Sequence, residues 1–165
     1  MQVPVVASAV TRCIPETTGE AEGEYVVFGS SSGWMVFYGA IALGMKSRGV
    51  ELMQHLDKSA NLLLEELKQE GKDSASKLDV VFERGDMLEA DISKARILLL
   101  ASQCWDGDLK ELVRAKAEAE LSDGAVVIDY SNTIFGQSKI LRLAGEADGR
   151  VSWNVNQRFF VYERV

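Results

Sequence analysis

The chain has 165 residues, of which 47% are hydrophobic and 26% are charged, and its net charge at pH 7 is −7. These values are typical of one globular domain with a sizeable core, and they exclude wholesale disorder. Because the chain is acidic and lacks an apolar run of the ~20 residues that a membrane span needs, we expect neither a nucleic-acid partner nor a membrane partner. An acidic surface would instead attract a basic protein.

The cysteines and the single histidine limit the chemistry that the chain can support. Cys13 and Cys104 lie far apart without C-x-x-C spacing, and His55 has no second histidine to join it. Free thiols in a reducing compartment are favoured over one disulfide, and no metal site is expected from so few ligands. Without a histidine beside it, Cys104 is expected to be a small buried residue rather than a nucleophile. The N-terminus lacks the basic region of a signal peptide, so we expect an intracellular protein, either cytoplasmic or nuclear.

Short apolar runs alternate with helix-forming segments along most of the chain. Residues 1–24 are predicted to be a lead-in and loop, and residues 25–165 a single domain. The predicted strands are 25–28, 48–51, 78–83, 96–101 and 125–130, and the predicted helices are 34–45, 52–71 and 109–121. Two β-prone runs flank residues 154–157 and predict an antiparallel hairpin. The alternation predicts an α/β fold with a doubly wound, mostly parallel, Rossmann-like sheet and this C-terminal hairpin.

A candidate nucleotide site lies between residues 26 and 52, whose sequence is VVFGSSSGWMVFYGAIALGMKSRGVEL. A strand enters a Gly/Ser turn, a helix follows, and a second strand ends on Glu51. Gly29 and Gly33 permit a tight turn that brings backbone N–H groups close to a ligand. A carboxylate about 20 residues on can accept hydrogen bonds from ribose hydroxyls. The alternative for Glu51 is a charge that is favoured near the start of a helix.

Four segments, taken in order, resemble one enzyme superfamily. They are VVFGSSSGW, RGVEL, RGDMLEADISKARILLLASQCWDGDL and GRVSWNVNQRFFVYERV. The sequence resembles the class I (seven-stranded) S-adenosylmethionine-dependent methyltransferases, and within them the non-SET histone lysine methyltransferases and their small microbial relatives. The resemblance runs from about Tyr25 to Val165.

This resemblance implies S-adenosyl-L-methionine as the cofactor, with the ribose on Glu51 and the adenine beside Asp86 and Met87. Trp105 would line the pocket for the methyl acceptor, although it could equally pack under a loop. Asp86 has an alternative as an ordinary turn residue. The residues that the resemblance places at the cofactor are Gly29, Ser30, Ser31, Gly33, Glu51, Asp86, Met87, Ala101 and Ser102.

Three positions depart from the family's pattern. Val27 stands where the family has an acid that helps to hold the methionine amino group, Ser31 replaces a glycine, and Ala101 replaces an asparagine. The resemblance therefore implies a methyltransferase of weakened or lost activity, acting on lysine of a basic protein, and no catalytic residue is identified. A non-catalytic scaffold of the same fold is the first alternative. A nicotinamide-dependent oxidoreductase is the second, since that cofactor also suits a Gly-rich βαβ unit.

Overall fold

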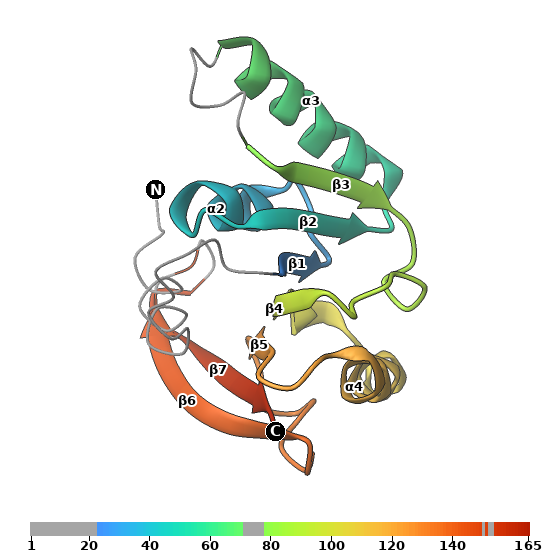
Figure 1. Ribbon diagram of the computed structural model, residues 1–165, viewed down its shortest axis with the longest axis vertical. Helices are drawn as coiled ribbons and strands as arrows, with labels where there is room; N and C mark the ends of the chain where they lie inside the picture. Colours follow the sequence, from blue (N-terminus) through green and yellow to red (C-terminus); the bar gives the residue numbers. More distant parts are fainter. Residues whose placement is uncertain (1–22, 71–77, 150, 152–153) are drawn as a thin grey trace.

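The computed structural model describes residues 23–70, 78–149, 151 and 154–165. One seven-stranded sheet runs through this part of the chain, with strand order β3-β2-β1-β4-β5-β7-β6 (Figure 1). The strands are β1 (Glu24–Phe28), β2 (Lys46–Glu51), β3 (Val80–Arg84), β4 (Ala95–Leu100), β5 (Val126–Asp129), β6 (Leu141–Gly149) and β7 (Gln157–Arg164). The helices are α2 (Trp34–Ala42), α3 (Gln54–Glu70) and α4 (Gly107–Glu120), and η2 (Ser102–Cys104) is a short 3-10 helix.

Strands β1 to β5 are parallel, and β7 is antiparallel to both of its neighbours. The chain moves outward from β1 to β3 and then crosses back to β4 on the other side of β1. The strand order therefore reverses between β1 and β4. Ligands of open α/β sheets bind outside the carboxyl ends of the strands at such a reversal.

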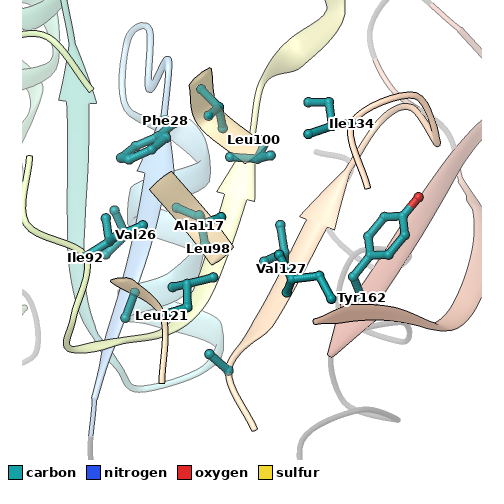
Figure 2. Packing of buried hydrophobic residues seen from close by; sticks show 14 of the residues in the cluster. Val26, Phe28, Ile92, Leu98, Leu100, Ala117, Leu121, Val127, Ile134 and Tyr162 are labelled. Carbon is teal, nitrogen blue, oxygen red and sulfur yellow. The ribbon is translucent and has the colours of Figure 1, made fainter. Parts of the chain in front are cut away.

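The central strands β1, β4 and β5 are buried on both faces, as in a sheet covered by helices. Along β1, Tyr25 and Val27 pack toward α2 and α3, whereas Val26 and Phe28 pack toward α4. Figure 1 shows α2 and α3 on one side of the sheet and α4 on the other. Figure 2 shows the hydrophobic layer on the α4 side of the sheet. Ala117 and other residues of α4 pack over the strands, and Tyr162 lies at the β7 edge of this layer. The predicted α/β fold with a mostly parallel sheet is confirmed.

Two boundaries differ from the prediction for physical reasons. Helix α2 ends at Ala42 rather than at residue 45, because Gly44 adopts a left-handed φ of +67° and the chain leaves the helix there. The terminal hairpin is formed by β6 and β7, so its first strand starts at Leu141 and not after Gly149. Strand β6 is an edge strand with mostly exposed side chains, and its Gly- and Asp-containing sequence gives little β signal.

The expected cap of α4 and the expected burial of Phe159 agree with the structure. Asp106 caps α4, since its side chain accepts a hydrogen bond from the Leu109 N–H. Phe159 is buried in the core of the hairpin, while Trp153 lies outside the described residues. Of the helices that the structure describes, none is both long and apolar enough to cross a membrane.

Candidate functional site

The turn after β1 is built on left-handed backbone. Gly29, Ser31 and Gly33 have φ angles of +72°, +52° and +89°. A Cβ added at Gly33 would lie 2.4 Å from Cζ of Phe82, so both backbone and space require glycine there. Ser31 adopts a conformation that is costly for a residue with a Cβ. The turn is therefore held in shape by its surroundings.

Glu51, the last residue of β2, is one of those surroundings. Its Oε2 accepts a hydrogen bond from the Ser31 N–H at 2.9 Å, and its Oε1 accepts one from the Met53 N–H at 2.9 Å. The side chain is largely buried beneath this turn. A carboxylate has about four acceptor positions, so two remain for the hydroxyls of a ligand. The bond to Met53 also places Glu51 just before α3, in line with its alternative as a helix-start charge.

The N–H groups of the turn have partners inside the protein. Those of Gly29 and Ser30 donate to the Val50 carbonyl at 3.0 and 3.1 Å, and that of Gly33 donates to the Ser30 carbonyl at 2.9 Å. Together with the Ser31–Glu51 bond, this accounts for four N–H groups that the sequence suggested would face a ligand. These four N–H groups are therefore not free to bind a pyrophosphate.

Ser30 directs its side chain into the fold. A Cβ added at Gly49 of β2 would lie 2.7 Å from both Cβ and Oγ of Ser30. The hydroxyl is buried and has no hydrogen-bond partner within the described residues. Both the hydroxyl and the N–H of Ser30, one of the predicted cofactor contacts, therefore face into the protein.

The tip of β3 lies beside the tip of β2, because the Gly85 N–H donates to the Glu51 carbonyl at 3.1 Å. Asp86 is exposed there, and its Oδ1 accepts the Leu88 N–H at 2.9 Å. This is the bond expected of a turn aspartate, and it leaves Oδ2 to face solvent. Met87, the next residue, is half-buried.

Sequence reasoning missed an apolar surface beside Glu51. Leu52 is 68% exposed and Met53 is 53% exposed. The sequence signal that could have predicted this surface was the pair of apolar residues directly after the acid that ends the strand. They offer apolar surface against which a heterocycle could pack, and Met87 follows the neighbouring tip of β3.

The tip of β4 packs against the turn after β1. The Ala101 N–H donates to the Phe28 carbonyl at 3.0 Å. A Cβ added at Gly29 would lie 3.5 Å from Cβ of Ala101 and 4.0 Å from Cζ2 of Trp105. Trp105 is half-buried and contacts the core on the α4 side. It therefore both packs in the fold and lies near the turn. Cys104 is exposed, so the expectation of a buried cysteine is wrong, because the η2 turn carries it to the surface.

A buried polar pair joins the tips of β4 and β5. The Ser102 hydroxyl bonds Oδ1 of Asp129, and the Tyr130 N–H donates to the same oxygen at 2.7 Å. Burial raises the pKa of Asp129 to about 6, opposed by the Ser102 hydroxyl, the N–H groups of Tyr130 and Ser131, and the charge of Lys110. The sequence prediction assigned Ser102 to the cofactor but did not single out Asp129. The missed signal was the same as for Glu51, namely an acid that ends an apolar strand.

Other features lie away from this edge. His55 is exposed on α3. Within the described residues, no three His, Cys, Asp or Glu side chains gather so that they could hold a metal ion. A hollow of about 630 Å³ lies at the opposite, amino-terminal edge of the sheet, near Gly23, Lys46 and Asp123. We place the candidate site at the carboxyl edge, because the strand-order reversal and the acids are there.

No protein-family model matches the sequence, and no curated protein matches it. Solved structures do match. An RNA methyltransferase from Salinibacter ruber, in complex with S-adenosyl-L-homocysteine, is 21% identical with a TM-score of 0.67, over 95% of this chain and 90% of that chain. TrmN from Thermus thermophilus is 15% identical with a TM-score of 0.67, over 97% of this chain and 48% of that chain.

A third structure is the geranyl diphosphate C-methyltransferase from Streptomyces coelicolor A3(2), in complex with Mg²⁺, geranyl diphosphate and S-adenosyl-L-homocysteine. It is 12% identical with a TM-score of 0.64, over 96% of this chain and 77% of that chain. At these identities the likeness establishes the fold, which is that of the class I methyltransferases. These proteins do not single out the histone lysine branch.

Proposed function

We propose that this domain binds S-adenosyl-L-methionine at the carboxyl edge of its sheet and is a methyltransferase. The observation that supports this most directly is Glu51, a largely buried carboxylate at the end of β2 that bonds the turn after β1 and accepts one backbone N–H on each oxygen. Glu51 would hold the ribose hydroxyls. Asp86 would face the adenine amino group, and Leu52, Met53 and Met87 would pack against the base.

The internal hydrogen bonds of the turn leave fewer free N–H groups for the pyrophosphate of a nicotinamide dinucleotide. A dinucleotide brings a pyrophosphate, which is bound by free backbone N–H groups at the start of the following helix. The N–H groups of Gly29, Ser30, Ser31 and Gly33 already have acceptors. S-adenosyl-L-methionine carries no phosphate, and several solved structures of this fold contain it or S-adenosyl-L-homocysteine.

The bound cofactor supplies an electrophilic methyl group on a sulfonium. The protein's own residues then have to align the acceptor and exclude water, rather than activate a strong nucleophile. Val27 is apolar and buried at the position of the family's first-strand acid, so the methionine end would be held less firmly. We therefore infer slow turnover. A non-catalytic scaffold that still binds the cofactor is the second candidate, and the same valine supports it.

For the acceptor we propose a lysine of a basic protein. The net charge of −7 would attract such a partner. Trp105 lies near the turn after β1 and offers an aromatic surface to an ammonium stem.

Titration calorimetry separates these candidates. S-adenosyl-L-methionine and S-adenosyl-L-homocysteine should each release or absorb heat on binding, while NAD should not. Binding of NAD alone would overturn the proposal. Transfer of a radiolabelled methyl group to basic proteins then distinguishes a slow enzyme from a scaffold, which would bind the cofactor and label nothing.

A further inference from the structure

Asp129 is the most unusual polar residue of the described structure. It ends β5, and its side chain is fully buried. Its Oδ1 receives two hydrogen bonds, from the Ser102 hydroxyl and the Tyr130 N–H. Its Oδ2 is equally buried but has no hydrogen-bond partner within the described residues. A buried carboxylate oxygen without a donor costs stability, and a catalytic role is one of the recognised reasons for such a group.

The position of Asp129 in the sheet indicates which ligand could interact with its carboxylate. Glu51 and Asp86 would fix an adenosine at the tips of β2 and β3, on one side of β1. Strand β5 lies on the other side of β1, beyond β4, and Asp129 pairs in register with Leu100 of β4. Neighbouring strands are about 4.8 Å apart, so the tip of β5 lies about 10 Å from that of β1. That distance places Asp129 past the methionine end of such a cofactor, where an acceptor approaches.

We propose that Asp129, oriented by Ser102, is the counter-charge for an amine acceptor. This inference rests on the proposed function and specifies the class of its substrate. The lone pair of the acceptor nitrogen forms the new bond to the methyl carbon, while the carbon–sulfur bond breaks and leaves its electron pair on sulfur. Positive charge passes from sulfur to nitrogen, and the buried anion of Asp129 acts on that charge through space from the tip of β5. A fixed anion placed where charge develops stabilises the transition state.

The surroundings of Asp129 agree with this role. Burial favours the protonated acid, yet the Ser102 hydroxyl, two N–H groups and Lys110 of α4 hold its pKa near 6. The other ionisable groups that sense its charge are Tyr130 and Tyr162, and both keep a raised pKa of about 12. Asp129 is therefore mostly ionised at pH 7 and above, and it becomes neutral below pH 6.

Sinefungin tests the proposal without turnover. It replaces the sulfonium methyl by a primary ammonium, which points toward the acceptor, whereas S-adenosyl-L-homocysteine has no charge there. Calorimetry at pH 8 should give Asp129→Asn an affinity for S-adenosyl-L-homocysteine within about twofold of the wild type. The preference of this variant for sinefungin over S-adenosyl-L-homocysteine should fall at least tenfold relative to the wild type. Asp148→Asn, which neutralises an exposed carboxylate of the β6–β7 hairpin, should change neither affinity.

A second measurement uses the wild-type protein alone. Between pH 8 and pH 5 the preference for sinefungin over S-adenosyl-L-homocysteine should fall about tenfold as Asp129 is protonated. An unchanged preference in both experiments, with S-adenosyl-L-homocysteine bound, would overturn the role of Asp129 and leave the proposed function intact. Failure of the wild type to bind either compound would overturn both.

Discussion

The Ser31 N–H donates to Oε2 of Glu51 at 2.9 Å, across 20 residues of sequence. This bond joins the turn after β1 to the end of β2, and the neighbouring Oε1 fixes the chain that enters α3 through Met53. One largely buried carboxylate thus shapes the turn. In the proposed function, ligand binding depends on the same group.

Glu51→Ala should therefore weaken both binding and folding. Loss of charge-assisted bonds to the ribose should lower the affinity for S-adenosyl-L-homocysteine by about 1.5–3 kcal/mol. The two N–H groups left without an acceptor should cost about 1–3 kcal/mol of unfolding free energy. Calorimetry and denaturant unfolding measure the two effects. Glu66→Ala, at an exposed position on α3, is the control, and unchanged affinity in Glu51→Ala would refute the ribose assignment.

The cost of a side chain in the turn can be separated from the cost of its backbone. Gly33 and Gly44 both have left-handed φ angles, of +89° and +67°, but a Cβ at Gly33 meets Phe82 at 2.4 Å and a Cβ at Gly44 meets nothing within 4 Å. Gly44→Ala should lose only the backbone term of about 1–2 kcal/mol. Gly33→Ala should lose more, because Phe82 must also move. Equal losses in thermal unfolding would show that the turn is less tightly packed than described.

Residues with strong local patterns were predictable from the sequence, and residues that depend on distant partners were not. The apolar runs at 96–101 and 125–130 predict buried strands because few other structures hide such runs, and they correspond to β4 and β5. Glu51 could be singled out because its strand, turn and helix are contiguous. Asp129 could not be singled out in this way, because its hydrogen-bond partner Ser102 is 27 residues away in the sequence. The pairing of β4 with β5 brings the two residues together.

The same reason explains the missed first strand of the hairpin. Among the described strands β6 pairs with β7 alone, and its side chains are mostly exposed. Its β structure therefore follows from backbone pairing with a well-patterned neighbour and not from its own residues. The sequence predicted turn N–H groups that approach a ligand, whereas those of Gly29 and Ser30 bond the Val50 carbonyl, which belongs to another strand.

Asp129 should make stability depend on pH in a definite direction. Burial raises its pKa from 3.8 to about 6, so between these values the folded protein binds more protons than the unfolded chain. Its contribution to stability is complete below about pH 4 and is lost as the pH rises through about 6. Each tenfold change in proton affinity corresponds to about 1.4 kcal/mol. The stability contribution of the Asp129 pKa shift is therefore of the order of 3 kcal/mol.

Unfolding of the wild type and of Asp129→Asn at pH 4.5 and pH 7.5 checks this. The unfolding free energy of the variant minus that of the wild type should be about 1–3 kcal/mol larger at pH 7.5 than at pH 4.5. Asp148 offers the opposite case, because its hydrogen bond to Arg158 lowers its pKa. Asp148→Asn should show no shift in the direction of Asp129→Asn. A pH-independent difference for Asp129→Asn would mean that its carboxyl titrates normally.

Binding of a basic acceptor should depend on ionic strength. With a net charge of −7, the domain attracts a cationic peptide over a screening length of about 30 Å at 0.01 M salt, which shrinks to about 8 Å at 0.15 M. The dissociation constant for a lysine-rich peptide should therefore rise at least tenfold across that range, while that for S-adenosyl-L-homocysteine, whose contacts are local, should change little. A matched peptide with glutamine in place of lysine should bind weakly at both salt concentrations. Peptide binding that ignores ionic strength, or methyl labelling confined to nucleic acid or a small metabolite, would exclude a basic protein as the acceptor.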